Sequence, residues 1–215
     1  MKILFFGDSI TDMGRERNFD ADEPFKYGSG YVRIVASELL KRDPMKYEIL
    51  NAGIGGNRVV DAYARVNRDV WVKSPDVLTM LVGINDICHP ELPGSGTELD
   101  RYERVYRKII EGTTERLPNC KIILIEPFVE RGWATLKQWE ALSGITQYAA
   151  VVKRLAEEYG AVFVPLQKKF DSATEKYGAE IVVDDGIHPC LYGQTIIADE
   201  WLKAFFDKVD SERKI

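Results

Sequence analysis

Near the amino terminus stands Phe5-Phe6-Gly7-Asp8-Ser9-Ile10-Thr11-Asp12, the stretch from which both the fold and the chemistry can be inferred. Residues 3–6 form an apolar run of strand-forming side chains, and Gly7 ends that run. A serine one step past a buried strand lies where α/β sheets present their chemistry, at the carboxyl ends of the strands. The same serine is also typical of a helix cap, so Ser9 alone does not establish a site.

The rest of the chain repeats this alternation of short apolar runs and longer segments with helical spacing. Four more strands are predicted at residues 47–50, 76–82, 121–125 and 161–164. Helices are predicted at residues 31–40, 59–71, 99–117, 145–159 and 167–177, and in a final segment that carries residues 196–206. Strands that alternate with helices indicate about five parallel strands with helices on both faces, which is a three-layer α/β sandwich.

Size and composition fit one globular domain over residues 1–215, without repeats or linkers. The formal net charge of -5 provides no basic surface, so nucleic acid is not expected as a partner. No apolar stretch approaches the roughly 18 residues of a membrane span, so no membrane partner is expected. Met1-Lys2 lead directly into the first strand and leave no room for a signal peptide, so a cytoplasmic location is expected. Cys88, Cys120 and Cys190 are odd in number and lack metal-type spacing, which favours reduced thiols.

The carboxyl-terminal part of the chain supplies what a nucleophilic serine needs. Asp184-Asp185-Gly186-Ile187-His188-Pro189 places a carboxylate three residues ahead of one of the two histidines. A serine hydroxyl is a poor nucleophile until a base takes its proton, and histidine, with an ordinary pKa of about 6.5, suits that task. The other histidine, His89, is interpreted as a loop residue.

Four sequence blocks in order complete the pattern: 7–11, 53–57, 83–86 and 185–189, which read Gly-Asp-Ser-Ile-Thr, Gly-Ile-Gly-Gly-Asn, Gly-Ile-Asn-Asp and Asp-Gly-Ile-His-Pro. Over nearly its whole length the chain resembles the SGNH hydrolases, also called the GDSL esterase/lipase family, which have a flavodoxin-like fold. This resemblance implies that Ser9 is the nucleophile, His188 the base and Asp185 the residue that orients the imidazole. It also implies an oxyanion hole made by the N–H groups of Ser9 and Gly56 and by the Asn85 side-chain amide.

Several of these residues also have simpler interpretations. Gly55 lies next to Gly56, and only the resemblance favours Gly56 as the donor. Asn85 is compatible with a mere turn cap, and Asp8 and Asp86 are expected to fix loop geometry rather than to take part in the chemistry.

Two other kinds of site use the same residues. Asp184, Asp185 and His188 carry metal-ligand atoms, but no second histidine cluster completes a metal site, so neither a metal nor a cofactor is expected. Residues 53–56 are rich in glycine and are compatible with a non-catalytic, flavodoxin-like module that binds phosphate or a nucleotide. That segment lacks the Gly-x-Gly-x-x-Gly spacing, which makes the esterase the favoured function.

Within the family, the chain looks most like the carbohydrate acetylesterases that act on xylan or its oligosaccharides. Residues 7–12, 28–32, 83–86 and 127–128 carry that likeness. It implies hydrolysis of acetyl esters on a small-molecule or oligosaccharide alcohol, with lysophospholipase or thioesterase activity as the alternative. Some members of this esterase group assemble as oligomers, so a homo-oligomer is an expectation as well.

Three tryptophans receive different interpretations. Trp133 and Trp139 follow the fourth predicted strand, where an aromatic ring can stack on a sugar or anchor a protein interface, and the sequence does not separate the two. Trp201 lies among the apolar residues of the last helix and is predicted to pack in the core. Arg15, Glu16 and Arg17 are expected in a solvated loop, with a place near the entrance of the site as the alternative.

Overall fold

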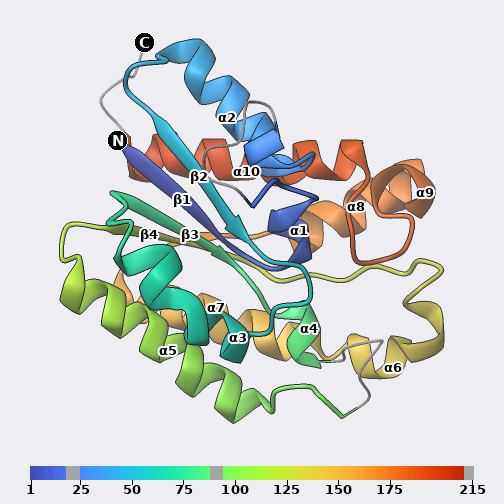
Figure 1. The fold of residues 1–215 in the computed structure, drawn as a ribbon. Coiled ribbons are helices and arrows are strands. Elements are labelled where there is room, and N and C mark those ends of the chain that lie inside the picture. The colour runs from blue at the N-terminus through green and yellow to red at the C-terminus, as the bar shows by residue number, and fades with distance from the viewer. Residues whose placement is uncertain (18–24, 88–93, 211–215) are drawn as a thin grey trace.

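A five-stranded parallel sheet forms the centre of the protein, in the order β2-β1-β3-β4-β5 (Figure 1). The structure is a computed structural model, and it describes residues 1–17, 25–87 and 94–210. The strands are β1 (Lys2–Gly7), β2 (Glu48–Gly53), β3 (Val77–Leu81), β4 (Lys121–Ile125) and β5 (Val162–Val164). The five predicted strands are therefore confirmed, with bounds that differ by at most three residues.

Helices cover both faces of the sheet, which confirms the three-layer sandwich. One apolar core joins the sheet to α2 (Tyr31–Arg42), α8 (Gln167–Tyr177), α9 (Ala179–Val182) and α10 (Leu191–Lys208). A second core joins the other face to α3 (Val59–Val66), α5 (Leu99–Arg116) and α7 (Ile145–Tyr159), and Figure 1 shows these two groups on opposite sides. All five residues of β3 are buried, as expected for a central strand whose two faces are both covered.

Some local structure differs from the sequence prediction. The helix predicted at residues 59–71 divides into α3 and a π-helical turn, η2 (Asn67–Trp71). Six further short elements were not predicted, because three or four residues are too few for a helical period to show. They are α1 (Ser9–Asp12), η1 (Phe25–Tyr27), α4 (Ile84–Ile87), η3 (Leu136–Gln138), α6 (Trp139–Leu142) and α9.

Trp201 packs in the core, as predicted. Its side chain is fully buried, its indole Nε1 donates to Thr79 Oγ1 at 2.9 Å, and its ring stacks on Phe205. Cys120 and Cys190 are free thiols, whereas Cys88 and His89 lie outside the described residues. Within the described part of the chain, no helix is both long enough and apolar enough to cross a membrane.

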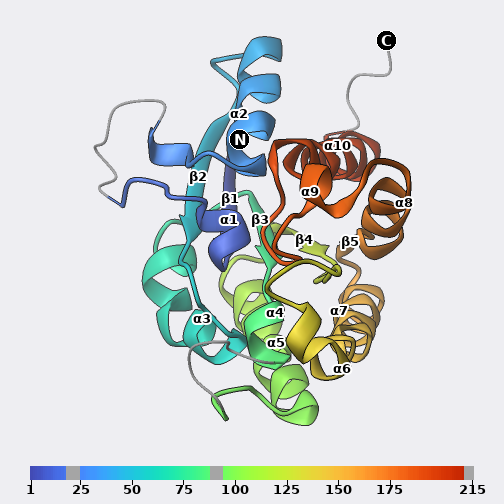
Figure 2. The same cartoon turned by 90° about the vertical axis from the view of Figure 1, so that its right-hand side faces the viewer.

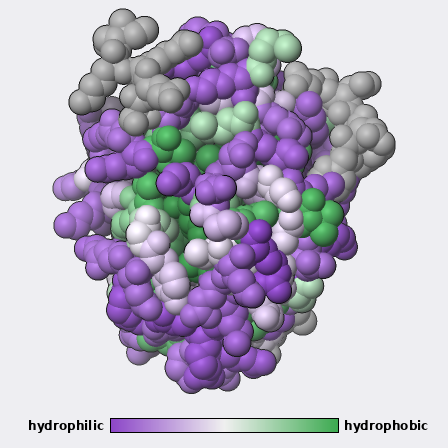
Figure 3. Space-filling view, turned by 90° about the vertical axis from the view of Figure 1, so that its left-hand side faces the viewer, coloured by the Kyte–Doolittle hydropathy of each residue, from purple (hydrophilic) through white to green (hydrophobic). Residues whose placement is uncertain are grey.

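The two edges of the sheet differ. Figure 3 shows the side on which the strands begin, where hydrophobic side chains are framed by a mostly hydrophilic surface. On the opposite side, where the strands end, α1, α4 and α6 and the loop before α10 gather around the ends of β1 and β3 (Figure 2). The predicted site residues lie on this second side.

Candidate active site

Ser9 is presented by a tight turn between β1 and α1. Asp8 caps the short helix, and its Oδ1 accepts the N–H of Ile10 at 3.0 Å. Gly7 is needed for this turn, since a Cβ at that position would lie 2.4 Å from both Leu81 O and Thr11 Oγ1. The first strand thus ends directly below a partly exposed serine.

The structure brings Ser9, His188 and Asp185 together in one hydrogen-bonded chain. Ser9 Oγ lies 2.8 Å from His188 Nε2, and His188 Nδ1 lies 2.6 Å from Asp185 Oδ2. The other carboxylate oxygen of Asp185 accepts the backbone N–H groups of Ile187 and His188, at 2.7 and 2.6 Å. The carboxylate is fixed in this way, and an Nδ1–H that donates to it leaves Nε2 free to accept the serine proton.

The charges in this hydrogen-bonded chain favour the protonated form of the His188 imidazole. The hydrogen bond to Asp185 raises the pKa of His188 above its ordinary 6.5, and this outweighs burial, which lowers it. Burial disfavours the charged form of Asp185, but hydrogen bonds from the His188 ring and backbone outweigh that effect and lower its pKa. The pair therefore stabilises an imidazolium that forms when Ser9 loses its proton.

A loop after β4 holds the Asp185 loop in place. Three backbone hydrogen bonds join the two loops: Glu130 N to Gly186 O at 2.9 Å, Trp133 N to Asp184 O at 3.2 Å and Ala134 N to Asp185 O at 3.2 Å. The approach is close enough that a Cβ on Gly132 would lie 2.2 Å from Gly186 N. We name residues 129–136 the supporting loop. Nothing in the local sequence predicts this contact between distant segments.

The three predicted oxyanion-hole donors follow the ends of three neighbouring strands: Ser9 follows β1, Gly56 follows β2 and Asn85 follows β3. Gly55 donates its N–H to Asp12 Oδ2 at 2.9 Å, so that donor is occupied. By contrast, the N–H groups of Ser9 and Gly56 have no protein acceptor among the described residues. Asn85 is 9% exposed, and one of its amide N–H bonds donates to Asn57 O at 3.1 Å, which orients the amide and leaves its second N–H for another acceptor. This geometry favours Gly56 over Gly55.

Asp8 and Asp86 make the structural contacts that were expected of them. Asp86 accepts the Val59 N–H with both carboxylate oxygens, at 3.0 and 3.1 Å, and so holds the start of α3. Burial raises the pKa of each of these carboxyl groups to about 7. Hydrogen bonds from nearby backbone N–H groups oppose that rise in both.

A pocket of about 620 Å³ opens over Ser9, His188 and Gly55. Arg15 does not lie in a solvated loop, contrary to expectation: it is 9% exposed and donates from Nε to Gly53 O at 2.8 Å. Glu16 and Arg17 are exposed, as expected for a solvated loop. Asp12 and Arg15 both line the pocket and were not identified as site residues, although the run after Ser9 placed them close to it in sequence.

Neither Trp133 nor Trp139 is among the residues that line this pocket. Trp133 belongs to the supporting loop, is 70% exposed, and donates its indole N–H to Asp184 Oδ2 at 3.2 Å. Trp139 is half-buried, lies 4.5 Å from the Arg131 guanidinium, and lines a separate pocket of about 460 Å³. Only Trp133 is thus directly attached to the Asp185 loop.

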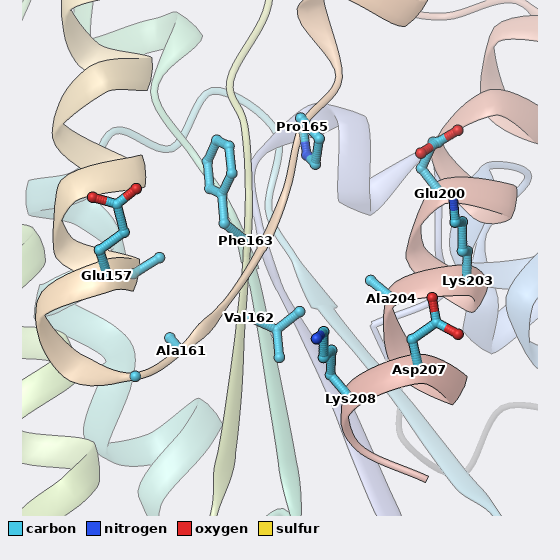
Figure 4. Close-up of a pocket in the computed structure, with 12 residues that line it drawn as sticks. Glu157, Ala161, Val162, Phe163, Pro165, Glu200, Lys203, Ala204, Asp207 and Lys208 are labelled. Atoms are coloured by element: carbon cyan, nitrogen blue, oxygen red, sulfur yellow. The ribbon is translucent and has the colours of Figure 1, made fainter. Parts of the chain in front are cut away.

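The remaining features of the described residues do not compete with this site. A groove of about 590 Å³ runs beside β5 between α7 and α10, lined by side chains of both charges such as Glu157 and Lys203 (Figure 4). No residue of that groove belongs to the Ser9 pocket. Among residues 1–17, 25–87 and 94–210, no group of three potential metal ligands comes together.

Comparison with known proteins gives consistent matches over most of the chain. The model of the GDSL-like Lipase/Acylhydrolase family matches residues 5–196. An acetylxylan esterase from Geobacillus stearothermophilus is 34% identical over 208 residues, which cover 94% of this chain and 92% of that protein. The crystal structure of an acetylxylan esterase from the same organism superposes with a TM-score of 0.84 at 33% identity, over 94% and 93% of the two chains. A GDSL-like lipase from Parabacteroides merdae superposes with a TM-score of 0.89 at 36% identity, over 94% of each chain.

Proposed function

Because the chain belongs to the GDSL-like lipase/acylhydrolase family and is a carboxylic ester hydrolase, we propose that it removes short acyl groups, above all acetyl, from carbohydrates such as acetylated xylo-oligosaccharides. The observation that carries the mechanism is the hydrogen-bonded chain from Ser9 through His188 to Asp185. These three side chains provide the nucleophile, the base and the orienting acid that serine-dependent ester hydrolysis needs.

The reaction proceeds in two halves. Ser9 Oγ attacks the ester carbonyl carbon while His188 Nε2 takes the hydroxyl proton, and the imidazolium then gives that proton to the departing alcohol. An acyl group is left on Ser9. Water attacks this acyl-enzyme with His188 again as the base, which releases the acid and restores the serine.

Negative charge develops on the carbonyl oxygen in both halves. The N–H groups of Ser9 and Gly56 and the free N–H of the Asn85 amide would donate to that oxygen. Each such donor typically contributes about 10²–10³ in turnover, because it is already oriented and needs no rearrangement.

The pocket supports a short acyl group on a polar alcohol. Of the residues that line it, only Met13 has a purely apolar side chain, whereas Asp12, Arg15 and Arg17 are charged. A long acyl chain would gain about 0.8 kcal/mol for each methylene group that it buries, and this lining offers little apolar surface for such a gain. The similarity to an acetylxylan esterase supports the same choice.

The test compares kcat/KM on acetyl, butyryl and octanoyl esters of one alcohol, and then on acetylated xylo-oligosaccharides and lysophospholipids. The acetyl ester and the acetylated sugar should be preferred. Ser9→Ala serves as the control for contaminating esterases. A kcat/KM that rises steadily with acyl length, or a preference for lysophospholipid or thioester substrates, would replace this proposal with the lysophospholipase or thioesterase alternative.

A further inference from the structure

One buried arginine lies behind the candidate site without lining its pocket. Arg65, on α3, is 9% exposed, and its guanidinium makes four hydrogen bonds. Three of the acceptors belong to the segments that carry the site: Gly7 O at 2.9 Å, Ala52 O at 2.7 Å and Asn57 Oδ1 at 2.6 Å. The buried guanidinium therefore joins α3 to the segments that carry the site.

Each acceptor is close in the chain to one of the three oxyanion-hole donors. Gly7 precedes Asp8 and Ser9, which we call the serine turn. Its carbonyl also accepts the N–H of Ile54 at 3.0 Å, and this bond ties the serine turn to residues 53–57, which we call the glycine loop. Asn57 directly follows Gly56.

The third donor is reached through the same residue. The carbonyl oxygen of Asn57 accepts the amide N–H that orients Asn85, while its side-chain oxygen accepts from Arg65 Nε. The acceptors of this guanidinium therefore include Gly7, two residues before Ser9, and Asn57, which follows Gly56 and is hydrogen-bonded to the Asn85 amide.

We infer that Arg65 is the positioning residue of the oxyanion hole, because it sets the serine turn, the glycine loop and the Asn85 amide in register with one another. This inference rests on the proposed serine esterase function. Arg65 touches no substrate, so its effect is transmitted through Gly7, Ala52 and Asn57.

The chemistry of the position requires arginine rather than lysine. A planar guanidinium presents five N–H bonds in fixed directions, whereas an ammonium group cannot span these acceptors at once. The charge is compensated where it is buried, since Nη1 also donates to Asp69 Oδ2 at 2.9 Å and the guanidinium lies 4.2 Å from the centre of the Phe6 ring.

The experiment measures kcat and KM on a simple acetyl ester for Arg65→Lys and Arg65→Gln, together with the rate at which an organophosphonate labels Ser9. Both variants should lose about 10- to 100-fold in kcat with KM changed less than about threefold, because donors displaced by a fraction of an ångström stabilise the transition state and not the bound ester. Labelling should slow by a similar factor, since the phosphonyl oxygen uses the same donors.

Asp210→Asn provides the control for lost stability. Asp210 is 8% exposed, accepts from Lys46 Nζ at 2.8 Å and from the Tyr47 hydroxyl at 2.5 Å, and lies near the start of β2, away from the site. This variant should unfold at a lower temperature and keep the parent kcat. A kcat within about threefold of the parent in folded Arg65→Lys and Arg65→Gln, or a change in KM alone, would overturn the inference.

If neither Arg65 variant folds, Asn57→Ala removes one acceptor without leaving a buried charge unpaired. It should lower kcat several-fold and leave KM nearly unchanged, because Asn57 links Arg65 to the Asn85 amide. An unchanged kcat in Asn57→Ala would count against Arg65. Absence of ester hydrolysis by the unaltered protein would instead refute the proposed function itself, so the two failures are distinguishable.

Discussion

Replacing Gly132 by alanine should disturb the Asp185 loop without altering any side chain of the Ser9–His188–Asp185 chain. A Cβ at this position would lie 2.2 Å from Gly186 N, 2.3 Å from the Asp185 carbonyl carbon and 2.5 Å from Asp184 O. All three are backbone atoms of the loop that carries the acid, so no flexible side chain can move aside. The two loops must separate instead.

The size of the effect follows from those distances. Ordinary van der Waals contact begins at about 3.4 Å, so the loops must move apart by roughly 1 Å. Three backbone hydrogen bonds join the supporting loop to residues 184–186, and each contributes about 1 kcal/mol net, which sets an upper limit of about 3 kcal/mol on the loss of stability. A displacement of about 1 Å at catalytic groups can lower turnover by about 10²-fold.

Steady-state kinetics on an acetyl ester and thermal unfolding measure the two effects. The matched control is Gly160→Ala at the end of α7, where φ is +64° and no atom lies within 4 Å of the added Cβ. That variant should lose about 0.5–1 kcal/mol of stability and keep the parent kcat. A Gly132→Ala protein with parent kcat and parent stability would show that the contact between the loops is not needed to hold Asp185.

Four further outcomes are expected. Ser9→Ala should abolish ester turnover, measured as acetate release, while the unfolding temperature changes little, because only one hydroxyl is removed; turnover at the parent level would refute Ser9 as nucleophile. Asp185→Asn should lower kcat by up to about 10⁴-fold and leave substrate binding intact, because the wrong imidazole tautomer is favoured, and parent kcat would exclude Asp185 as the orienting acid. The pH profile of kcat/KM should rise through an apparent pKa above 6.5, since Asp185 raises the pKa of His188 and only the neutral imidazole accepts a proton; a flat profile from pH 5 to about 8 would argue against a histidine base. Finally, burial raises the pKa of Glu130 to about 8, so between pH 4.5 and about 8 the folded state holds a proton that the unfolded chain releases. The contribution of Glu130 to the free energy of unfolding should therefore fall as the pH rises through this range. Denaturant titrations at several pH values should show that unfolding free energy depends less steeply on pH in Glu130→Gln than in the parent protein.

The strands, the Ser9 turn and the Asp185–His188 pair could be predicted because each is encoded over a short stretch of sequence. A strand buried on both faces is a continuous apolar run, as in β3. Asp185 and His188 lie three residues apart in one loop, so the carboxylate reaches both the ring and the backbone N–H of the histidine. Gly56 and Asn85 came from the family resemblance and not from spacing.

Contacts between loops could not be predicted in this way. Arg15 sits in a run of charged residues that looks solvated, and only the fold places it against the end of β2, where Gly53 O accepts its Nε–H. Arg65 on its own helix is an ordinary basic residue, and its role emerges from acceptors up to 58 residues away. Gly132 likewise has meaning only beside the loop of residues 184–186.

Strand order explains why the parts of the site meet although they are far apart in sequence. In the order β2-β1-β3, the strand that ends at the Ser9 turn lies between the strand that leads to Gly56 and the strand that leads to Asn85. The order reverses direction between β1 and β3, and the crevice at such a reversal is where open α/β sheets bind ligands. Donors from both neighbouring strands can therefore converge on one oxygen above Ser9, while the loop before α10 brings His188 to the serine hydroxyl. Inserting a strand between β1 and β3 would separate Asn85 from Ser9 by about 4.8 Å more, which is further than one amide side chain can compensate.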